Sequence, residues 1–274
     1  MSKITTIKAR EIIDSRGDPT VEVDIALDGG GVTSANVGSG TSIGSYEMHE
    51  LRDGDLGRLR GRGVTRVVEN VNHYLAPQII GMEFNNQKVF DQYIVGLDGT
   101  PSLEHYGANG ILCLSYAYAM AEADRQKQPA YVSFRMLRED LDPSAKLEIP
   151  KPMINIFNGG KLAAFSTDAQ EFNIVIKNAS SFRQALQVGA DIYHAVGTIL
   201  QKSGFGKQVG DEGGYSVPNA TTDQGMSLIV EGTQLAGYKA EDMALCWMWQ
   251  RIICTPMRDC IIFLITMVMY RHNI

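Results

Sequence analysis

The sequence predicts an α/β protein, with an α+β domain at its N-terminus followed by a region in which strands and helices alternate. Three observations support this prediction. Residues 19–28 alternate apolar and acidic side chains, as a half-buried strand does. Residues 64–81 and 107–137 carry apolar side chains at helical spacing. Beyond residue 150, strand-like and helix-like segments follow one another. We therefore expect one domain over residues 1–140, a second over 150–245, and a separate tail over 246–274.

The composition is that of a globular protein with a packed core. Of the 274 residues, 44% are apolar and 20% are charged, and the formal net charge is −6. This charge, without any Lys/Arg-rich run, argues against nucleic-acid binding. The N-terminal segment lacks the apolar core of a secretory signal, and the four cysteines lack the spacing of a zinc site. We therefore expect a cytoplasmic protein.

A membrane anchor is the alternative that the C-terminal tail raises. Residues 260–270 read "CIIFLITMVMY" and are almost entirely apolar. A membrane-spanning helix needs roughly 20 consecutive apolar residues, so this run is too short. We expect no association with a membrane.

The first domain is expected to begin with an antiparallel meander. Its strands are residues 4–13, 19–28 and 31–37, and "LDGGG" supplies a hairpin turn. Helices are expected at 64–81 and, as one long buried stretch, at 107–137. Three prolines within residues 140–152 then indicate a linker.

The second domain is expected to alternate strands with helices. Serine and glycine bracket an amphipathic helix at 181–204, and a second capped helix covers 221–238. Strand-like segments lie on either side of them, and "KQVGDEGGYSV" (207–217) reads as a short strand that enters a glycine-rich loop. This alternation predicts a parallel sheet or barrel, in which the chemistry lies on the loops after the strands. The other predicted strands are "PMINIFN" (152–158), "EFNIVI" (171–176) and "DMALCWMW" (242–249).

Three short stretches carry side chains suited to catalysis. "GSGTSIGSYE" (38–47) is a glycine-rich loop able to close over a polar ligand, with Ser42 as an oxygen ligand for a hard cation. "QEF" places Gln170 and Glu171 at the start of a strand. "GDEGGYSVP" (210–218) places two carboxylates where a strand ends, a suitable place for an acid catalyst. Taken singly, each stretch also fits a plainer interpretation: a surface connection, a strand end and an Asx-type turn.

Taken together, the motifs resemble those of the enolases. "EIIDSRGDPTVEVDI", "HELRDGD", "GANGIL", "NGG", "QEF" and "VGDEGGYSVPN" occur in this order and spacing. The resemblance covers residues 3 to 245. It implies an enolase-like α+β N-terminal domain followed by an incomplete TIM-type (β/α) barrel.

The resemblance also implies a reaction and a set of site residues. Enolases interconvert 2-phosphoglycerate and phosphoenolpyruvate with Mg²⁺, in glycolysis and gluconeogenesis, and commonly form homodimers. By position, Glu212 matches the general acid, and Gln170 and Glu171 match substrate-binding residues. Ser42 matches the loop serine that binds the second magnesium ion.

Departures from the family pattern argue against activity. Enolases carry a histidine after "NGG", and Leu162 stands at that position here, with neither a hydrogen-bond donor nor a charge. Gly38, Thr41 and Ile43 replace the usual proline, alanine and threonine of the glycine-rich loop. The lysine base, the three carboxylates that bind magnesium and a substrate-binding lysine have no counterpart in the sequence. Asp259 lies outside every matching motif and is given no role.

The match stops at an unusual stretch. Enolases read roughly Ala-Leu-Asp-Val-Ala at a strand where this chain reads "MALCWMWQ", and both tryptophans of the protein lie there. Cys-Trp-Met-Trp-Gln is encoded by TGY TGG ATG TGG CAR, which in the frame that skips two bases reads Leu-Asp-Val-Ala. We interpret the chain beyond residue 245 as out-of-frame translation, with a divergent C-terminus as the alternative.

Three functions compete for this sequence. The first is an enolase-family lyase whose present chain is inactive, and the second is a non-catalytic derivative that acts as an interaction protein. The third is an acid-sugar dehydratase of the wider superfamily, against which "SGTSIG" and "GDEGGY" argue.

An interrupted barrel also exposes a strand edge, so we expect poor solubility.

Overall fold

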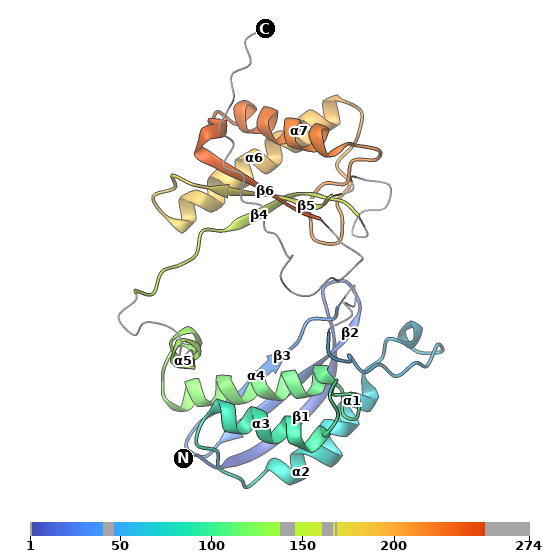
Figure 1. Ribbon diagram of the computed structural model, residues 1–274, viewed down its shortest axis with the longest axis vertical. Coiled ribbons are helices and arrows are strands. Elements are labelled where there is room, and N and C mark those ends of the chain that lie inside the picture. Colours follow the sequence, from blue (N-terminus) through green and yellow to red (C-terminus); the bar gives the residue numbers. More distant parts are fainter. Residues whose placement is uncertain (1, 41–46, 138–145, 161–166, 168, 250–274) are drawn as a thin grey trace. The chain divides into compact units, whose positions relative to one another are not determined.

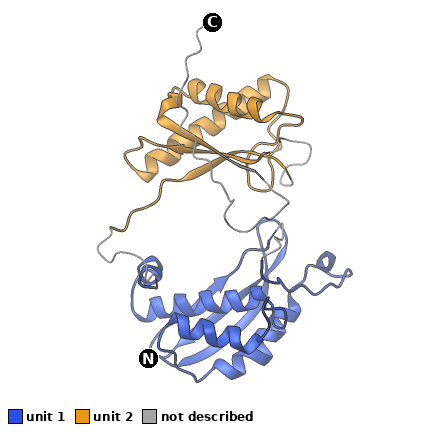
Figure 2. Cartoon of the chain, viewed as in Figure 1, with its two compact units in different colours: residues 1–145 blue, residues 146–274 orange. Residues whose placement is uncertain are grey.

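The chain consists of two compact units, residues 1–145 and 146–274 (Figure 2). The computed structural model describes residues 2–40, 47–137, 146–160, 167 and 169–249, and the side chains of these residues up to position 246. No helix of the described ranges is both long and apolar enough to cross a membrane.

Unit 1 contains the antiparallel meander that the sequence predicts. Strands β1 (Ile4–Ile13), β2 (Pro19–Leu27) and β3 (Val32–Asn36) pair in that order. The register joins Ile7 to Ile25 and Val23 to Ala35, and the apolar side chains at the centre of β2 are fully buried, whereas the acidic ones between them are half-buried. The alternating pattern therefore marked a genuine sheet, and β2 lies at its centre.

Helices cover this sheet (Figure 1). A short 3-10 turn (η1, Leu59–Gly61) precedes a helical run at 65–79, which includes a π-helical segment and confirms the helix expected at 64–81. Helix α4 packs on β2 and β3, with α3 beside it. The run and the next two helices comprise α1 (Thr65–Glu69), η2 (Asn70–Leu75), α2 (Ala76–Ile79), α3 (Gln87–Asp98) and α4 (Ala108–Arg125).

The prediction of a single helix over 107–137 is wrong, because the structure has two helices there. Helix α4 ends at Arg125, and α5 (Ala130–Met136) begins after a short break. Lys127 adopts a left-handed backbone with φ of 52°, and Pro129 supplies no backbone N–H. Both features interrupt the ladder of helical hydrogen bonds. Helix α3 was not predicted from the sequence; the Asn86 side chain caps its start, and Gly99 is its C-cap.

Unit 2 packs two helices against one face of a three-stranded sheet. The strands are β4 (Met153–Asn158), β5 (Ala169–Ile176) and β6 (Met243–Trp249), and they pair in the order β4-β5-β6. Helices α6 (Phe182–Lys202) and α7 (Thr222–Leu235) follow β5, and a 3-10 turn (η3, Ala240–Asp242) precedes β6 (Figure 1). The caps predicted at Ser181 and Thr221 are present. Within the described residues the sheet is open, as expected of an incomplete barrel.

The prediction that neighbouring strands of unit 2 pair in parallel is wrong. Both strand pairs, β4 with β5 and β5 with β6, are antiparallel. No described helix separates β4 from β5, so the chain returns as a hairpin does. Two helices separate β5 from β6, so the chain crosses the sheet twice and enters β6 in the reverse direction. The carboxyl ends of β4 and β6 therefore lie at the same end of the sheet as the start of β5.

The expected short strand at 207–217 is also absent. The segment lies in a loop with two isolated bridges, from Tyr215 to Phe157 and from Tyr215 to Val209. Its glycines, rather than any strand, control its path.

Candidate functional site

The site in unit 2 forms where the chain turns beside the carboxyl end of β4. The residues "GDEGG" make a turn closed by backbone hydrogen bonds, from the Gly213 N–H to the Gly210 carbonyl and from the Gly210 N–H to the Gly214 carbonyl. Tyr215 then pairs with β4, because its N–H donates to Ile156 and its carbonyl accepts from the N–H of Asn158. The turn is thereby held against β4, and the predicted carboxylate of Glu212 lies on it.

Asn158 ties the turn to the strand with its side chain. It is fully buried. Its Nδ2 donates to Glu212 Oε2 at 3.1 Å, and its Oδ1 accepts from the Gly214 N–H at 2.8 Å. Gly214 is required here, because a Cβ would lie 2.7 Å from Asn155 Oδ1 and 2.8 Å from Asn158 Oδ1. Close backbone approach thus explains the second glycine of the pair.

Glu171 reaches the same place from β5. It pairs with Asn158 in the register of β4 and β5, and its Oε2 accepts from Asn173 Nδ2 at 2.9 Å. Glu212 is an exposed residue, but partial desolvation of its carboxyl raises its pKa, and a hydrogen bond with the Glu171 carboxyl and the charge of Glu171 raise it further. The hydrogen bond from Asn158 acts in the opposite direction. The two glutamates therefore form a coupled pair that favours retention of a proton on Glu212.

The other predicted residues do not join this pair through described side-chain contacts. Gln170 lies at a β-bulge, where its backbone carbonyl accepts from the Gly159 N–H at 2.8 Å. Ser42 and Leu162 lie outside the described residues. The structure thus unites Glu171 with Glu212, and Gln170 enters the site through its backbone.

Sequence reasoning missed the support behind the turn. Tyr193 of α6 donates its hydroxyl to the Gly213 carbonyl at 2.8 Å, and its ring stacks on Tyr215 with centroids 4.3 Å apart. Gly197 makes room for Tyr215, because a Cβ there would lie 2.2 Å from the Tyr215 hydroxyl oxygen. Burial raises the pKa of Tyr215, so it stays neutral. The sequence signal that could have predicted this contact was a tyrosine and a glycine spaced one helical turn apart on the expected helix.

The asparagines of the two strands were also missed. Asn155 and Asn158 of β4 and Asn173 of β5 lie on the sheet face that carries Glu171, as the register shows. Cys246 of β6 pairs with Asn173 and lies on this face too. Polar residues recurring within otherwise apolar strands were the signal, since buried strands are usually apolar.

The residues described at this site do not by themselves form a magnesium cage. Within the described ranges, no group of three or more His, Cys, Asp or Glu side chains is close enough to hold a metal ion. The two glutamates are engaged with each other and with amide donors. Mg²⁺ usually requires near-octahedral oxygen ligation, and a pair of carboxylates supplies only part of it. The donor set of this part of the chain therefore does not fit the expected ion.

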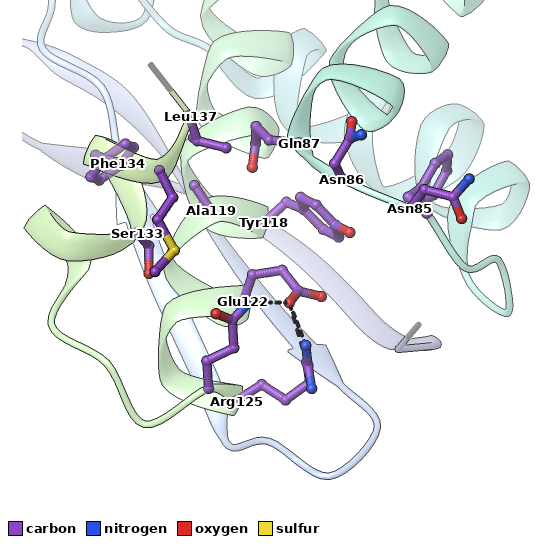
Figure 3. Close-up of a pocket in the computed structure, with 13 residues that line it drawn as sticks. Asn85, Asn86, Gln87, Tyr118, Ala119, Glu122, Arg125, Ser133, Phe134 and Leu137 are labelled. Carbon is purple, nitrogen blue, oxygen red and sulfur yellow. Dashed lines mark hydrogen bonds and ion pairs between the residues drawn. The ribbon is translucent and has the colours of Figure 1, made fainter. Parts of the chain in front are cut away.

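Unit 1 also contains cavities, and Gly38, Gly40 and Glu47 of the predicted glycine-rich loop line one of them. Another cavity of about 250 Å³ lies between α4, α5 and the segment before α3 (Figure 3). Tyr118 and Phe134 line it, and Glu122 accepts hydrogen bonds from Arg125 at 2.9 and 3.2 Å. Because its charges are already paired, this cavity lacks the uncompensated groups that favour catalysis.

Comparison with known families covers both units. The model of the enolase N-terminal domain matches residues 4–134. The model of the enolase C-terminal TIM barrel domain matches residues 146–247.

Proposed function

Because the chain belongs to the enolase family, we propose that it descends from a phosphopyruvate hydratase, a lyase that converts 2-phosphoglycerate to phosphoenolpyruvate. The observation that carries this proposal is the coupled pair of Glu171 and Glu212 beside the carboxyl end of β4. Loss of hydroxide from the substrate requires a proton donor, and a carboxyl group with a raised pKa is suited to that role. We assign the general-acid role to Glu212 and a substrate-site role to Gln170 and Glu171.

We further propose that the 274-residue chain does not turn over this substrate. The reaction removes a proton next to a carboxylate, which requires a base and stabilisation of the new negative charge. We assign no residue of this chain to the base. Leu162 replaces the histidine of the family pattern. Without these groups the chain is a non-catalytic derivative, and a role in binding other molecules is the second candidate function.

The domain division belongs to the same proposal. We place an enolase-type N-terminal domain at 1–140, part of a barrel at 150–245 and an out-of-frame tail at 246–274. The end of the barrel-domain match at residue 247 supports the last boundary. Sequencing the encoding DNA across codons 240–260 tests it. An intact frame without an enolase reading downstream in either alternative frame contradicts the proposal.

The cellular setting is carried over from the family. We propose a cytoplasmic location, and for the ancestral enzyme a place in glycolysis and gluconeogenesis with a requirement for Mg²⁺. Ser42 would be a ligand of the second ion, but the main metal ligands of the family are not present in this chain. The ancestral enzyme was a homodimer, and the incomplete barrel argues against that assembly here. The net charge of −6 supports a small-molecule substrate rather than a nucleic acid as the partner.

An assay of phosphoenolpyruvate formation with Mg²⁺ tests the catalytic proposal. We expect no turnover from the chain as written. A frame-restored chain that keeps Leu162 should be slow, and Leu162→His in that chain should raise kcat by about 10²-fold, the usual worth of one positioned polar group. Glu212→Gln should abolish the gain. Turnover by the original chain contradicts the proposed inactivity, and an inactive frame-restored Leu162→His chain contradicts the proposed reaction.

A further inference from the structure

The Glu171–Glu212 pair is held in place by asparagine side chains to which no role has been assigned. Asn158 and Asn173 are buried and lie on the sheet face that carries Glu171. Asn155 is a weaker partner, because its Nδ2 lies 3.4 Å from Glu212 Oε2. The buried amides therefore meet the carboxylates from two adjacent strands.

Two of the contacts of Asn158 have different consequences. Its Oδ1 accepts from the Gly214 N–H at 2.8 Å and fixes the backbone of the turn. Its Nδ2 donates to Glu212 Oε2 at 3.1 Å and fixes the carboxylate. An ionised carboxylate in place of the amide could keep the first contact but not the second, since it has no proton to donate.

Two carboxylates side by side repel each other unless a proton or a donor lies between or around them. Glu171 has its own donor, Asn173, at 2.9 Å. Glu212 accepts from Asn158, with Asn155 as a weaker partner, and lies on a turn that backbone contacts and the Tyr193 hydroxyl also hold. Asn158 is thus the residue whose side chain contacts both the Glu212 carboxylate and the backbone of the turn that carries it.

We propose that Asn158 is a positioning residue, whose buried amide anchors the Gly213–Gly214 turn to β4 and so keeps the Glu212 carboxyl in contact with Glu171. This role deepens the proposed function, and its importance for catalysis rests on the proposed general-acid role of Glu212.

The charged groups near Glu212 determine what the test must resolve. In the part of the chain that the structure describes they are Glu171 on β5 and Asp211 on the turn, and both raise the pKa of Glu212, whereas the Asn158 bond lowers it. Removing the anchor also removes the Asn158 hydrogen bond, and that loss by itself raises the pKa of Glu212. A fall of the pKa towards its ordinary value therefore requires that Glu212 separates from Glu171. Replacing the amide by a carboxyl group keeps the turn in place, adds a like charge and raises the pKa.

The experiment is a carboxyl-carbon NMR titration of the full chain labelled at glutamate side chains, with Glu212→Gln to assign the signal. Asn158→Leu removes both contacts at similar volume, and Asn158→Asp keeps the contact to Gly214. Asn219→Asp is the matched control, because it adds the same charge at an exposed left-handed position that Asp tolerates. Amide spectra establish that each variant is folded.

We expect the midpoint of Glu212 to fall in Asn158→Leu and to rise by about one pH unit in Asn158→Asp. The control should leave it unchanged. A midpoint that moves in the same direction in both variants, or in neither, overturns the inference. If Asn158→Leu does not fold, a failure of Asn158→Asp to raise the midpoint is sufficient to overturn it.

The result is independent of catalysis, since no substrate is present. The expected titrations together with an inactive frame-restored Leu162→His chain would leave the positioning role intact and refute the proposed reaction. Unchanged titrations together with an active frame-restored Leu162→His chain would refute the positioning role and leave the proposed reaction intact.

Discussion

At the scale of single residues, buried polar groups hold their neighbours through several directed contacts. Asp98 in unit 1 is 4% exposed, and its carboxylate accepts from the N–H groups of Tyr106 at 2.7 Å and Thr100 at 3.2 Å and from the Thr100 hydroxyl. Burial raises the pKa of Asp98, but these hydrogen bonds outweigh it and leave the pKa below the ordinary value of 3.8. Asp98 thus connects the end of α3 to the segment before α4.

The first prediction concerns the acid stability of this region. Because the pKa of Asp98 is lower in the folded state, its contribution is complete above the unfolded value of 3.8 and is lost as the pH falls through the folded value. Asp98→Asn should destabilise α3 and α4 by about 1–3 kcal/mol at neutral pH, because the NH₂ of the new amide then faces the N–H and O–H donors that the carboxylate accepted from. The difference from the wild-type chain should shrink in acid.

Hydrogen exchange of the α3 and α4 amides measures this effect locally. Asp28→Asn is the control, because Asp28 is exposed and its loss removes the same charge. The control should change the stability by less than about 0.5 kcal/mol. An effect of Asp98→Asn that persists undiminished in acid would refute the assigned cause.

At the scale of elements, close approach between α6 and the glycine-rich turn forms the site. Tyr215 is 3% exposed and lies between Phe157 of β4 and Tyr193 of α6. Gly197 allows this packing, since its missing Cβ leaves space for the Tyr215 ring. Helix α6 therefore supports the segment that carries Glu212.

The second prediction is that Gly197→Ala disturbs this support. The new Cβ would lie 2.2 Å from the Tyr215 hydroxyl oxygen and 2.8 Å from Cζ, so the ring must shift. Overpacking of this kind costs about 1–3 kcal/mol, and exchange of the α6 amides should increase accordingly.

Gly96→Ala on α3 provides the matched control. Nothing lies within 4 Å of a Cβ built there, so alanine should stabilise that helix by about 0.5–1 kcal/mol. If Gly197→Ala were as harmless as Gly96→Ala, the packing account of the turn would be wrong.

At the scale of the whole molecule, the exposed edge of unit 2 governs behaviour in solution. Within the described residues, β6 pairs with β5 alone, so its other edge presents unpaired backbone groups. The sequence continues with the apolar run "IIFLITMVM" (261–269). Edges and apolar segments of this kind promote association between chains.

The third prediction is that the purified 274-residue chain is poorly soluble or depends on chaperones. Light scattering and size-exclusion chromatography measure this, with a frame-restored chain as the comparison. A monodisperse sample of the original chain with a cooperative thermal melt would contradict the expectation.

The sequence by itself determined the family, the meander, the capped helices and the two glutamates of the pair. Periodicity and caps are local properties, so they identified the β1–β3 strands, α6 and α7 without knowledge of any distant contact. The ordered motifs identified Glu171 and Glu212 in the same way. The break between α4 and α5 was missed because the local pattern on both sides of it is helical.

Only the tertiary structure decided which partners these groups meet. The antiparallel course of β5, the approach of the turn to β4 and the contact between Asn158 and Glu212 join residues far apart in the chain. Such contacts depend on how elements pack and on where backbone hydrogen bonds are satisfied, and no local pattern encodes them. The pair of glutamates was therefore predictable as residues, whereas its asparagine support and the raised pKa of Glu212 followed from the fold.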